Sequence, residues 1–99
     1  MHARMSILEG SPDQIDEGLR YVRENVLPQL NQQDGFKGMI ALADRQSGKT
    51  LGITFWESEE ALRASEEAAN RMREDSADAL SDTIAGVERY EVGFLEMSS

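Results

Sequence analysis

Four segments of the chain have apolar residues at the spacing or density of β-strands. Over residues 2–8, Ala3, Met5 and Ile7 alternate with polar neighbours, which predicts a strand with one drier face. Two apolar runs flank the segment 44–49, whose Ser-Gly pair is typical of a hairpin turn. The four expected strands are residues 2–8, 36–43, 50–56 and 87–97.

The first expected helix begins after Ser11, which can cap its N-terminus, and Pro12 suits the first helical position. Its apolar residues recur at steps of three and four and therefore form one stripe along the helix. The stripe consists of Ile15, Leu19, Val22, Val26 and Leu30. Pro28 lies within this pattern, and we expect it to kink or loosen the last turn because proline has no backbone N–H.

The second expected helix begins after Ser58, a suitable N-cap, and has acidic residues on its exposed face. Its stripe of mostly small residues consists of Ala61, Leu62, Ser65, Ala68, Ala69 and Met72. A continuous helix to Asp82 would span about 37 Å, which is longer than strands of about 25–30 Å. We therefore expect a break near Asp75 or Ser76, followed by a short helix through Leu80.

The expected elements follow one another as strand, helix, strand, strand, helix and strand. With right-handed crossovers, this order gives an α+β, ferredoxin-like β-α-β-β-α-β sandwich, a four-stranded antiparallel sheet with two helices on one face. The length of the chain fits a single domain over residues 1–99. One face of the sheet would then be covered by the chain's own helices, and the other would be uncovered.

The third expected strand has two different faces. Leu51, Ile53 and Phe55 form a uniformly apolar set, and we expect this set to face the helices. Thr54 and Trp56 would then lie on the uncovered face. A bare aromatic surface is a liability for a monomer, so we expect Trp56 to be buried beside a partner subunit.

The uncovered face leads us to expect a homodimer in which the sheet of each copy covers the other. The pattern of the last strand leaves open which of its residues lie on this face. The expected members are Trp56, Met39 or Ile40, and either Tyr90 and Phe94 or Leu95.

The charge and the absence of cysteine exclude several functions. Acidic residues outnumber basic ones by 19 to 10, giving a net charge of −9, so we expect no nucleic-acid or membrane partner. Without cysteine there is no disulfide and no thiolate metal site. His2 is the only histidine, while Arg71 and Arg73 are flanked by acids and form no basic patch. No apolar run reaches the roughly 20 residues of a membrane span and no signal peptide is evident, so we expect a cytoplasmic protein.

One local motif points to a family. Gly35-Phe36 precedes a strand and a hairpin, and the chain then reads T-F-W-E-S-E-E-A-L from Thr54 to Leu62. This motif, with the element order over nearly the whole chain, resembles the antibiotic-biosynthesis monooxygenase family of the dimeric α+β barrel superfamily. The resemblance implies a ferredoxin-like protomer whose sheet packs against a second copy around a lumen. The activities it implies are cofactor-free oxidation of polycyclic aromatics or quinols, oxidative opening of haem, or stress-associated ligand binding.

The resemblance also assigns positions to the family's functional residues. Trp56 falls on the tryptophan that lines the family's pocket. The aromatic-oxidising branch also uses an asparagine and a tyrosine, whose positions correspond here to Gly52 and Leu62. The haem-opening branch uses a histidine on the second helix, where this chain has none, and an asparagine on the first strand, near Ala3. We therefore expect no haem binding by that route, no metal and no cofactor.

The sequence leaves two functions open. The first is a dimeric protein, non-catalytic or stress-associated, that binds a small apolar or aromatic ligand. The alternative is a cofactor-independent monooxygenase for an aromatic or quinol substrate, on which Trp56 would stack. The candidate pocket residues are Trp56, Thr54, Arg4, Tyr90 and Met39, and no catalytic residue is assigned. Buried polar side chains aimed at Trp56 would favour the enzyme, whereas a lumen filled by Met5, Met39 and Leu95 would favour packing.

Overall fold

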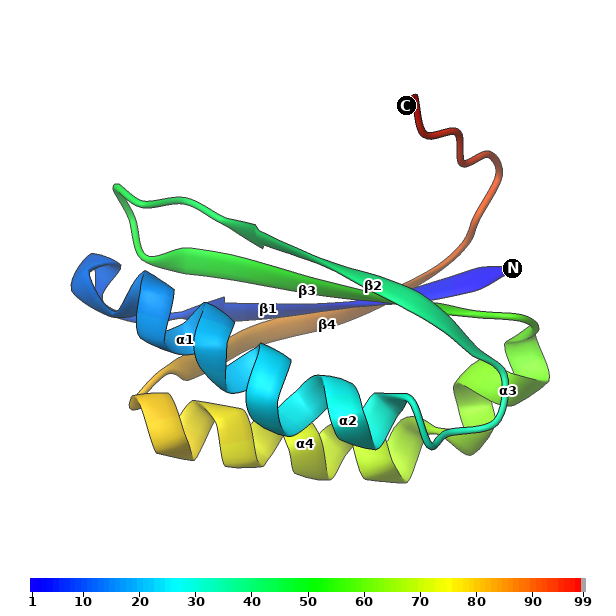
Figure 1. The fold of residues 1–99 in the computed structure, drawn as a ribbon, viewed down its shortest axis with the longest axis horizontal. Helices are drawn as coiled ribbons and strands as arrows, with labels where there is room; N and C mark the ends of the chain where they lie inside the picture. Colours follow the sequence, from blue (N-terminus) through cyan, green and yellow to red (C-terminus); the bar gives the residue numbers. More distant parts are fainter. Residues whose placement is uncertain (99) are drawn as a thin grey trace.

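A computed structural model describes residues 1–98 of the chain (Figure 1). The strands are β1 (His2–Glu9), β2 (Phe36–Ala43), β3 (Lys49–Trp56) and β4 (Thr83–Glu91). The helical segments are η1 (Pro12–Gln14), α1 (Ile15–Tyr21), η2 (Val22–Val26), α2 (Leu27–Leu30), α3 (Glu59–Ala64) and α4 (Glu66–Leu80). The expected element order is confirmed, and each expected helix is divided into shorter pieces.

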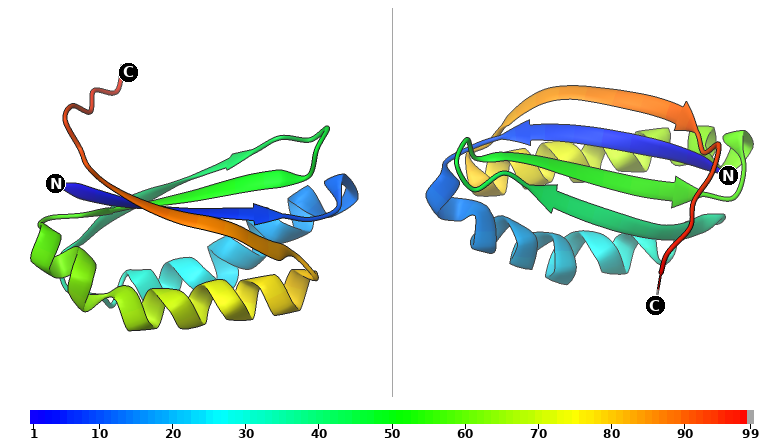
Figure 2. Two further views of the ribbon diagram at one scale, coloured as in Figure 1. Left: turned by 180° about the vertical axis from the view of Figure 1, so that it is seen from behind. Right: turned by 90° about the horizontal axis from the view of Figure 1, so that it is seen from above.

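The four strands form one antiparallel sheet in the order β2-β3-β1-β4. The helices cover one face of this sheet, and the opposite face has no helix over it in the described part of the chain (Figures 1 and 2). This is the ferredoxin-like sandwich that the sequence predicted. Within residues 1–98, no helix combines the length and the apolar composition needed to cross a membrane.

The face of the sheet that the helices cover is not the one that we expected. Trp56, at the end of β3, is fully buried and packs against leucine and methionine side chains of α2, α3 and α4. Because side chains alternate along a strand, Thr54 shares this face, whereas Leu51, Ile53 and Phe55 lie on the other. The prediction that these three residues face the helices is therefore wrong. Both faces of β3 carry apolar surface, so apolarity alone does not distinguish them.

The pairing of β4 with β1 determines which residues of the last strand lie on each face. Tyr90 pairs with Ala3 and lies on the uncovered face. Arg89 pairs with Arg4 on the helix-covered face, where its side chain binds Glu66 of α4. Of the two alternatives that the sequence left open, the uncovered face therefore has Tyr90.

The last strand ends earlier than expected because its pairing partner ends. β4 lies at an edge of the sheet and pairs with β1 alone. Its final paired residue is Glu91, and the N–H of Val92 then bonds to the carbonyl of Met1 at 2.9 Å. The prediction of a strand through residue 97 is wrong at this end. Phe94 and Leu95 lie beyond the sheet and are exposed.

Pro28 changes the hydrogen bonding of the first helix. In η2 the bonding is π-helical, and the N–H of Leu27 bonds to the carbonyl of Val22, five residues back. Pro28 has no N–H to offer to the carbonyl of Glu24, and its ring crowds that carbonyl. The wider turn before the proline accommodates both effects, so the loosening expected near Pro28 is confirmed.

The second helix is broken at Ser65, near its start, and the prediction of a break at Asp75 or Ser76 is wrong. Arg4 of β1 reaches this point, and its Nη2 donates to the Leu62 carbonyl at 2.7 Å and to the Ser65 hydroxyl at 3.0 Å. The Ser65 hydroxyl also donates to the Leu62 carbonyl, at 2.7 Å. In a continuous helix this carbonyl would accept the N–H four residues further on. The helix therefore breaks where the buried side chains of Arg4 and Ser65 donate hydrogen bonds to the Leu62 carbonyl, which a continuous helix would use for its own backbone bonding.

Trp56 is the central side chain of the hydrophobic core. It is 0% exposed and forms a cluster with Leu30, Leu62 and Met72, one from each of α2, α3 and α4. The ring of Phe36 meets it edge to face, with ring centroids 5.5 Å apart. The cluster around this one residue at the end of β3 therefore includes side chains from α2, α3 and α4.

We expect Trp56→Ala to lower the free energy of unfolding by about 3–5 kcal/mol, because a fully packed aromatic ring is removed and a cavity is left. Urea denaturation followed by far-UV circular dichroism measures this change without relying on tryptophan fluorescence. Phe94→Ala is the matched control, since Phe94 lies beyond the sheet and is 83% exposed, and its effect should be within about 1 kcal/mol. Equal losses in the two variants would contradict the assignment of Trp56 as the core residue.

Candidate functional site: a cavity between the sheet and the helices

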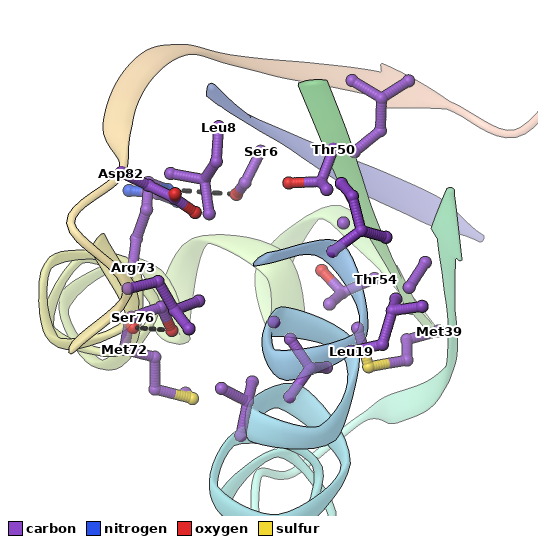
Figure 3. A pocket seen from close by; sticks show the side chains of 18 of the residues that line it. Ser6, Leu8, Leu19, Met39, Thr50, Thr54, Met72, Arg73, Ser76 and Asp82 are labelled. Atoms are coloured by element: carbon purple, nitrogen blue, oxygen red, sulfur yellow. Dashed lines mark hydrogen bonds between the residues drawn. The ribbon is translucent and has the colours of Figure 1, made fainter. Parts of the chain in front are cut away.

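A cavity of about 120 Å³ lies between the helix-covered face of the sheet and the helices (Figure 3). The wall that α1, η2, α2 and α4 provide is mainly apolar. The wall that the strands provide is more polar and includes Arg4, Ser6, Thr50, Gly52 and Thr54. Ser11, Gln14 and Ala41 also line the cavity and are exposed, so it meets solvent at these residues.

The cavity lies within one protomer, on the opposite side of the sheet from the pocket that we expected. The sequence had suggested a pocket in the lumen between the sheet and a second copy. That expectation followed from placing Thr54 and Trp56 on the uncovered face. Because both residues face the helices, the polar and small residues of β1 and β3 line an internal space instead.

The structure places four of the five candidate pocket residues together. Arg4, Thr54 and Met39 line the cavity, one from each of β1, β3 and β2. Trp56 lies next to this group, because its Nε1 donates to Thr54 Oγ1 at 2.9 Å and the Arg4 guanidinium lies 5.7 Å from its ring centroid. Tyr90 is on the opposite side of the sheet, where its hydroxyl donates to the carboxylate of Glu88.

The indole of Trp56 has no hydrogen-bond donor left for a ligand. Tryptophan has a single N–H, and here Thr54 accepts it. The ring itself is enclosed by the core and by the Arg4 guanidinium, a cation–π arrangement. Trp56 therefore orients two cavity-lining side chains, Arg4 and Thr54.

Arg4 belongs to a partly buried ionic network that joins the neighbouring strands β1 and β4 to α4. Its Nη2 lies 3.0 Å from Glu66 Oε1. Arg89 holds the same carboxylate through two bonds, from Nε to Oε1 at 2.6 Å and from Nη2 to Oε2 at 2.7 Å. Hydrogen bonds from Arg89 and Arg4 lower the pKa of Glu66 to about 2, although burial opposes the shift. This carboxylate is therefore ionised at neutral pH and fixes the position of Arg4.

Arg73 of α4 is a cavity residue that the sequence did not reveal. Its side chain is only 9% exposed and extends from α4 toward β1, where Nε donates to Ser6 Oγ at 3.0 Å (Figure 3). Its Nη1 donates to Asn70 Oδ1 at 2.8 Å. The neighbouring acids suggested a surface position. The position of Arg73 four residues after Ala69 could have revealed its burial, because residues at this spacing share one face of a helix.

A carboxylate lies at the rim of the cavity. Asp82 follows α4, lines the cavity and is half-buried, and burial raises the pKa of its carboxyl. It packs so closely on Gly10 that a Cβ there would come within 1.8 Å of Asp82 Oδ1. Glycine at position 10 therefore allows the carboxylate to approach the loop between β1 and η1.

The cavity can hold a ring with oxygen substituents. Its helical wall offers apolar contact to the ring. The strands offer hydroxyl groups and the guanidinium of Arg4 to the oxygens, and α4 adds the guanidinium of Arg73. Across residues 1–98, no group of three or more His, Asp or Glu side chains is arranged to hold a metal ion. The chemistry of the site is therefore that of hydrogen bonding and charge around an apolar space.

We expect Glu66→Gln to lower the free energy of unfolding at neutral pH by about 1–3 kcal/mol, because Arg4 loses its buried counter-charge. The folded pKa, about 2, lies below the ordinary 4.5, so the ionised carboxylate stabilises the fold above pH 4.5. This contribution is lost as the pH falls toward 2, and the difference between the variant and the parent should shrink over that interval. Urea denaturation across this pH range measures it. Glu67→Gln, at the exposed neighbouring position, should have no such pH-dependent difference.

The relatives in sequence are longer than this chain. It is 37% identical over 95 residues to one uncharacterized protein of Mycobacterium tuberculosis. This alignment covers 96% of this chain and 40% of that protein. It is 36% identical over 92 residues to a second uncharacterized protein of the same organism, covering 93% of this chain and 41% of that protein. The chain thus spans about two-fifths of the length of these relatives. No protein-family profile matches the sequence.

Solved structures share the fold over almost their whole length. A monooxygenase from the gene ActVA-Orf6 of Streptomyces coelicolor, solved with the ligand Nanaomycin D, is 19% identical with a TM-score of 0.68, over 99% of this chain and 91% of that one. SnoaB, a cofactor-independent oxygenase from Streptomyces nogalater, is 14% identical with a TM-score of 0.66, over 95% and 94%. A dimeric ferredoxin-like protein from an uncultured marine organism is 10% identical with a TM-score of 0.70, over 99% and 100%. The resemblance inferred from the sequence is confirmed at the level of the fold: this chain has the ferredoxin-like fold of the antibiotic-biosynthesis monooxygenases.

Proposed function

We propose that the protein binds a small aromatic ligand with oxygen substituents in the cavity between its sheet and its helices. The cavity itself is the observation that supports this proposal, because it is apolar over most of its wall and has a few polar side chains on one side. Ligand sites have this character, with the polar groups fixing the orientation of the ligand. Closely packed interiors leave few voids larger than a water molecule.

The size of the cavity limits the ligand to about one ring. An apolar cavity of roughly 150 Å³ is known to hold benzene, and this cavity is about 120 Å³. A larger ligand would have to displace part of the helical wall. That wall includes η2, whose π-helical turn is a less regular arrangement than an α-helix.

Gly52 keeps the cavity open from the strand side. It lies in the middle of β3, pairs with Ser6 and shares the helix-covered face with Thr54. A Cβ at this position would meet no other atom within 4 Å. A side chain at position 52 would therefore enter the cavity, and its Cβ would displace no neighbouring atom.

We expect the parent protein to bind hydroquinone and Gly52→Val to bind it at least about tenfold more weakly, because the added methyl groups occupy the cavity. Anaerobic isothermal titration calorimetry measures the affinities and prevents oxidation of the quinol. Stability of the variant should be unchanged or higher by up to about 1 kcal/mol, since valine favours strands more than glycine does.

Ala43→Val is the matched control, because it adds a similar side chain at an exposed position of β2 outside the cavity. It should leave hydroquinone affinity unchanged. Equal affinities in the parent and Gly52→Val would contradict binding in this cavity.

A second candidate function is cofactor-independent oxidation of the bound ligand. The fold shared with SnoaB and with the Streptomyces coelicolor monooxygenase supports it. Binding without chemistry is favoured, because the Trp56 N–H is used by Thr54, and Gly52 and Leu62 occupy the positions of the asparagine and tyrosine of the aromatic-oxidising branch. Oxygen uptake after air is admitted to the hydroquinone-loaded protein, and absent in Gly52→Val, would favour the oxygenase.

We further propose that a second copy of the chain covers the open face of the sheet. Six apolar side chains on this face are partly exposed in the protomer: Met5, Ile7, Ile40, Leu51, Ile53 and Phe55. A neighbour with the same fold is described as a dimeric ferredoxin-like protein. A stable interface needs about 800 Å² from each partner, which a sheet of four strands can supply.

We expect light scattering to give a mass of about twice the 11.0 kDa of one chain. Ile53→Asp should shift the mass to that of a single chain, because Ile53 lies at the centre of the open face, paired with Met5 and Ile40. Arg71→Asp, on the exposed side of α4, is the control and should not change the mass. A parent protein that is monomeric at micromolar concentration would contradict the proposed dimer.

A further inference from the structure

Arg73 has an unused hydrogen-bond donor at the cavity. Two of its guanidinium nitrogens donate to Ser6 and Asn70, but Nη2 is buried and has no partner among residues 1–98. The side chain is 9% exposed, so bulk water does not surround it. Buried polar atoms almost always have a hydrogen-bond partner, and because Arg73 lines the cavity, a ligand held there can supply the missing acceptor.

The charge of Arg73 also has no carboxylate partner. Its two bonded neighbours, Ser6 and Asn70, are both neutral. None of the ion pairs in the described part of the chain includes Arg73. Glu66 is close enough to act on its pKa but is bound by Arg4 and Arg89, and Glu74 is exposed. A buried charge without a counter-charge is costly.

Arg4 adds a second positive charge to the same cavity. Burial and the charge of Arg4 lower the pKa of Arg73, but an arginine in a protein stays ionised. The chain has nearly twice as many acidic as basic residues, with a net charge of −9. Even so, it places two arginines against the cavity and its carboxylate Asp82 only at the rim. Because Glu66 balances the charge of Arg4, Arg73 is the cavity-lining arginine that has no carboxylate partner among residues 1–98.

We infer that Arg73 forms a subsite for the ionised oxygen of an aromatic ligand, a phenolate or a carboxylate on a single ring. The ring would occupy the apolar part of the cavity against the helices, and its oxyanion would accept a hydrogen bond from Arg73 Nη2. This inference rests on the proposed ligand-binding function and adds the charge of the ligand. A guanidinium suits this role because it offers a charge and a directed donor together.

Three compounds of similar size test the inference. They are 4-nitrophenol, whose phenolate has a visible absorbance; benzoate, a carboxylate; and 4-nitrotoluene, in which an uncharged methyl group replaces the hydroxyl. In the parent protein, bound 4-nitrophenol should have a lower pKa than free 4-nitrophenol, because the neighbouring cation favours the phenolate. Absorbance titration measures that shift directly and needs no variant.

Arg73→Gln should weaken binding of 4-nitrophenolate and benzoate by about 10- to 100-fold, the range for a hydrogen bond to a charged group. It should change 4-nitrotoluene binding by less than about threefold, since the apolar wall is intact. Arg73→Lys keeps the charge and should retain most of the selectivity for anions. Arg71→Gln removes the same charge from the exposed side of α4 and should behave as the parent protein.

The outcomes separate the inference from the proposed function. Binding of all three compounds with no preference for anions, or a raised pKa of bound 4-nitrophenol, would overturn the anion subsite and leave the ligand cavity in place. A parent protein that binds none of the three would overturn both. If Arg73→Gln does not fold, the pKa shift in the parent and the selectivity of Arg73→Lys decide the question. Loss of only benzoate binding would restrict the subsite to carboxylates, and loss of only phenolate binding to phenolates.

Discussion

The guanidinium of Arg4 connects β1 to β3, α3 and α4. It extends from β1, lies over the ring of Trp56 at the end of β3, and donates to the Leu62 carbonyl and to Ser65 where the second helix breaks. Its charge is balanced by Glu66 of α4, which also holds Arg89 of β4. A buried cation must have such partners, so the break in the helix and the position of the core tryptophan depend on one side chain.

The cavity lies beside the packed group of side chains around Arg4. Arg4, Thr54 and Trp56 fill one end of the space between sheet and helices with bonded, closely packed groups. Further along β1 and β3, Ser6 and Gly52 are too small to reach the helices, and Arg73 extends across from α4 to bond Ser6. The interior is therefore well packed where the ionic network holds it and open where small residues pair across β1 and β3.

The sequence was sufficient for the fold and insufficient for the site. Strands were found from alternation and hairpin signals, and the first helix from its stripe and from Pro28, because these are local properties of the chain. The face of β3 was assigned wrongly, because the apolar residues Ile53 and Phe55 lie on the open face, whereas the face under the helices is more polar. The break at Ser65 and the burial of Arg73 depend on contacts between residues about 60 positions apart, which periodicity along one helix does not report.

Gly52 is a position at which a single mutation can change the cavity. A single base change converts a glycine codon into one for alanine or valine, and a Cβ at residue 52 would meet no other atom within 4 Å. The hydrogen bonds of β3 and the packing around Trp56 do not involve that space. The cavity can therefore be narrowed in one step while the fold is kept.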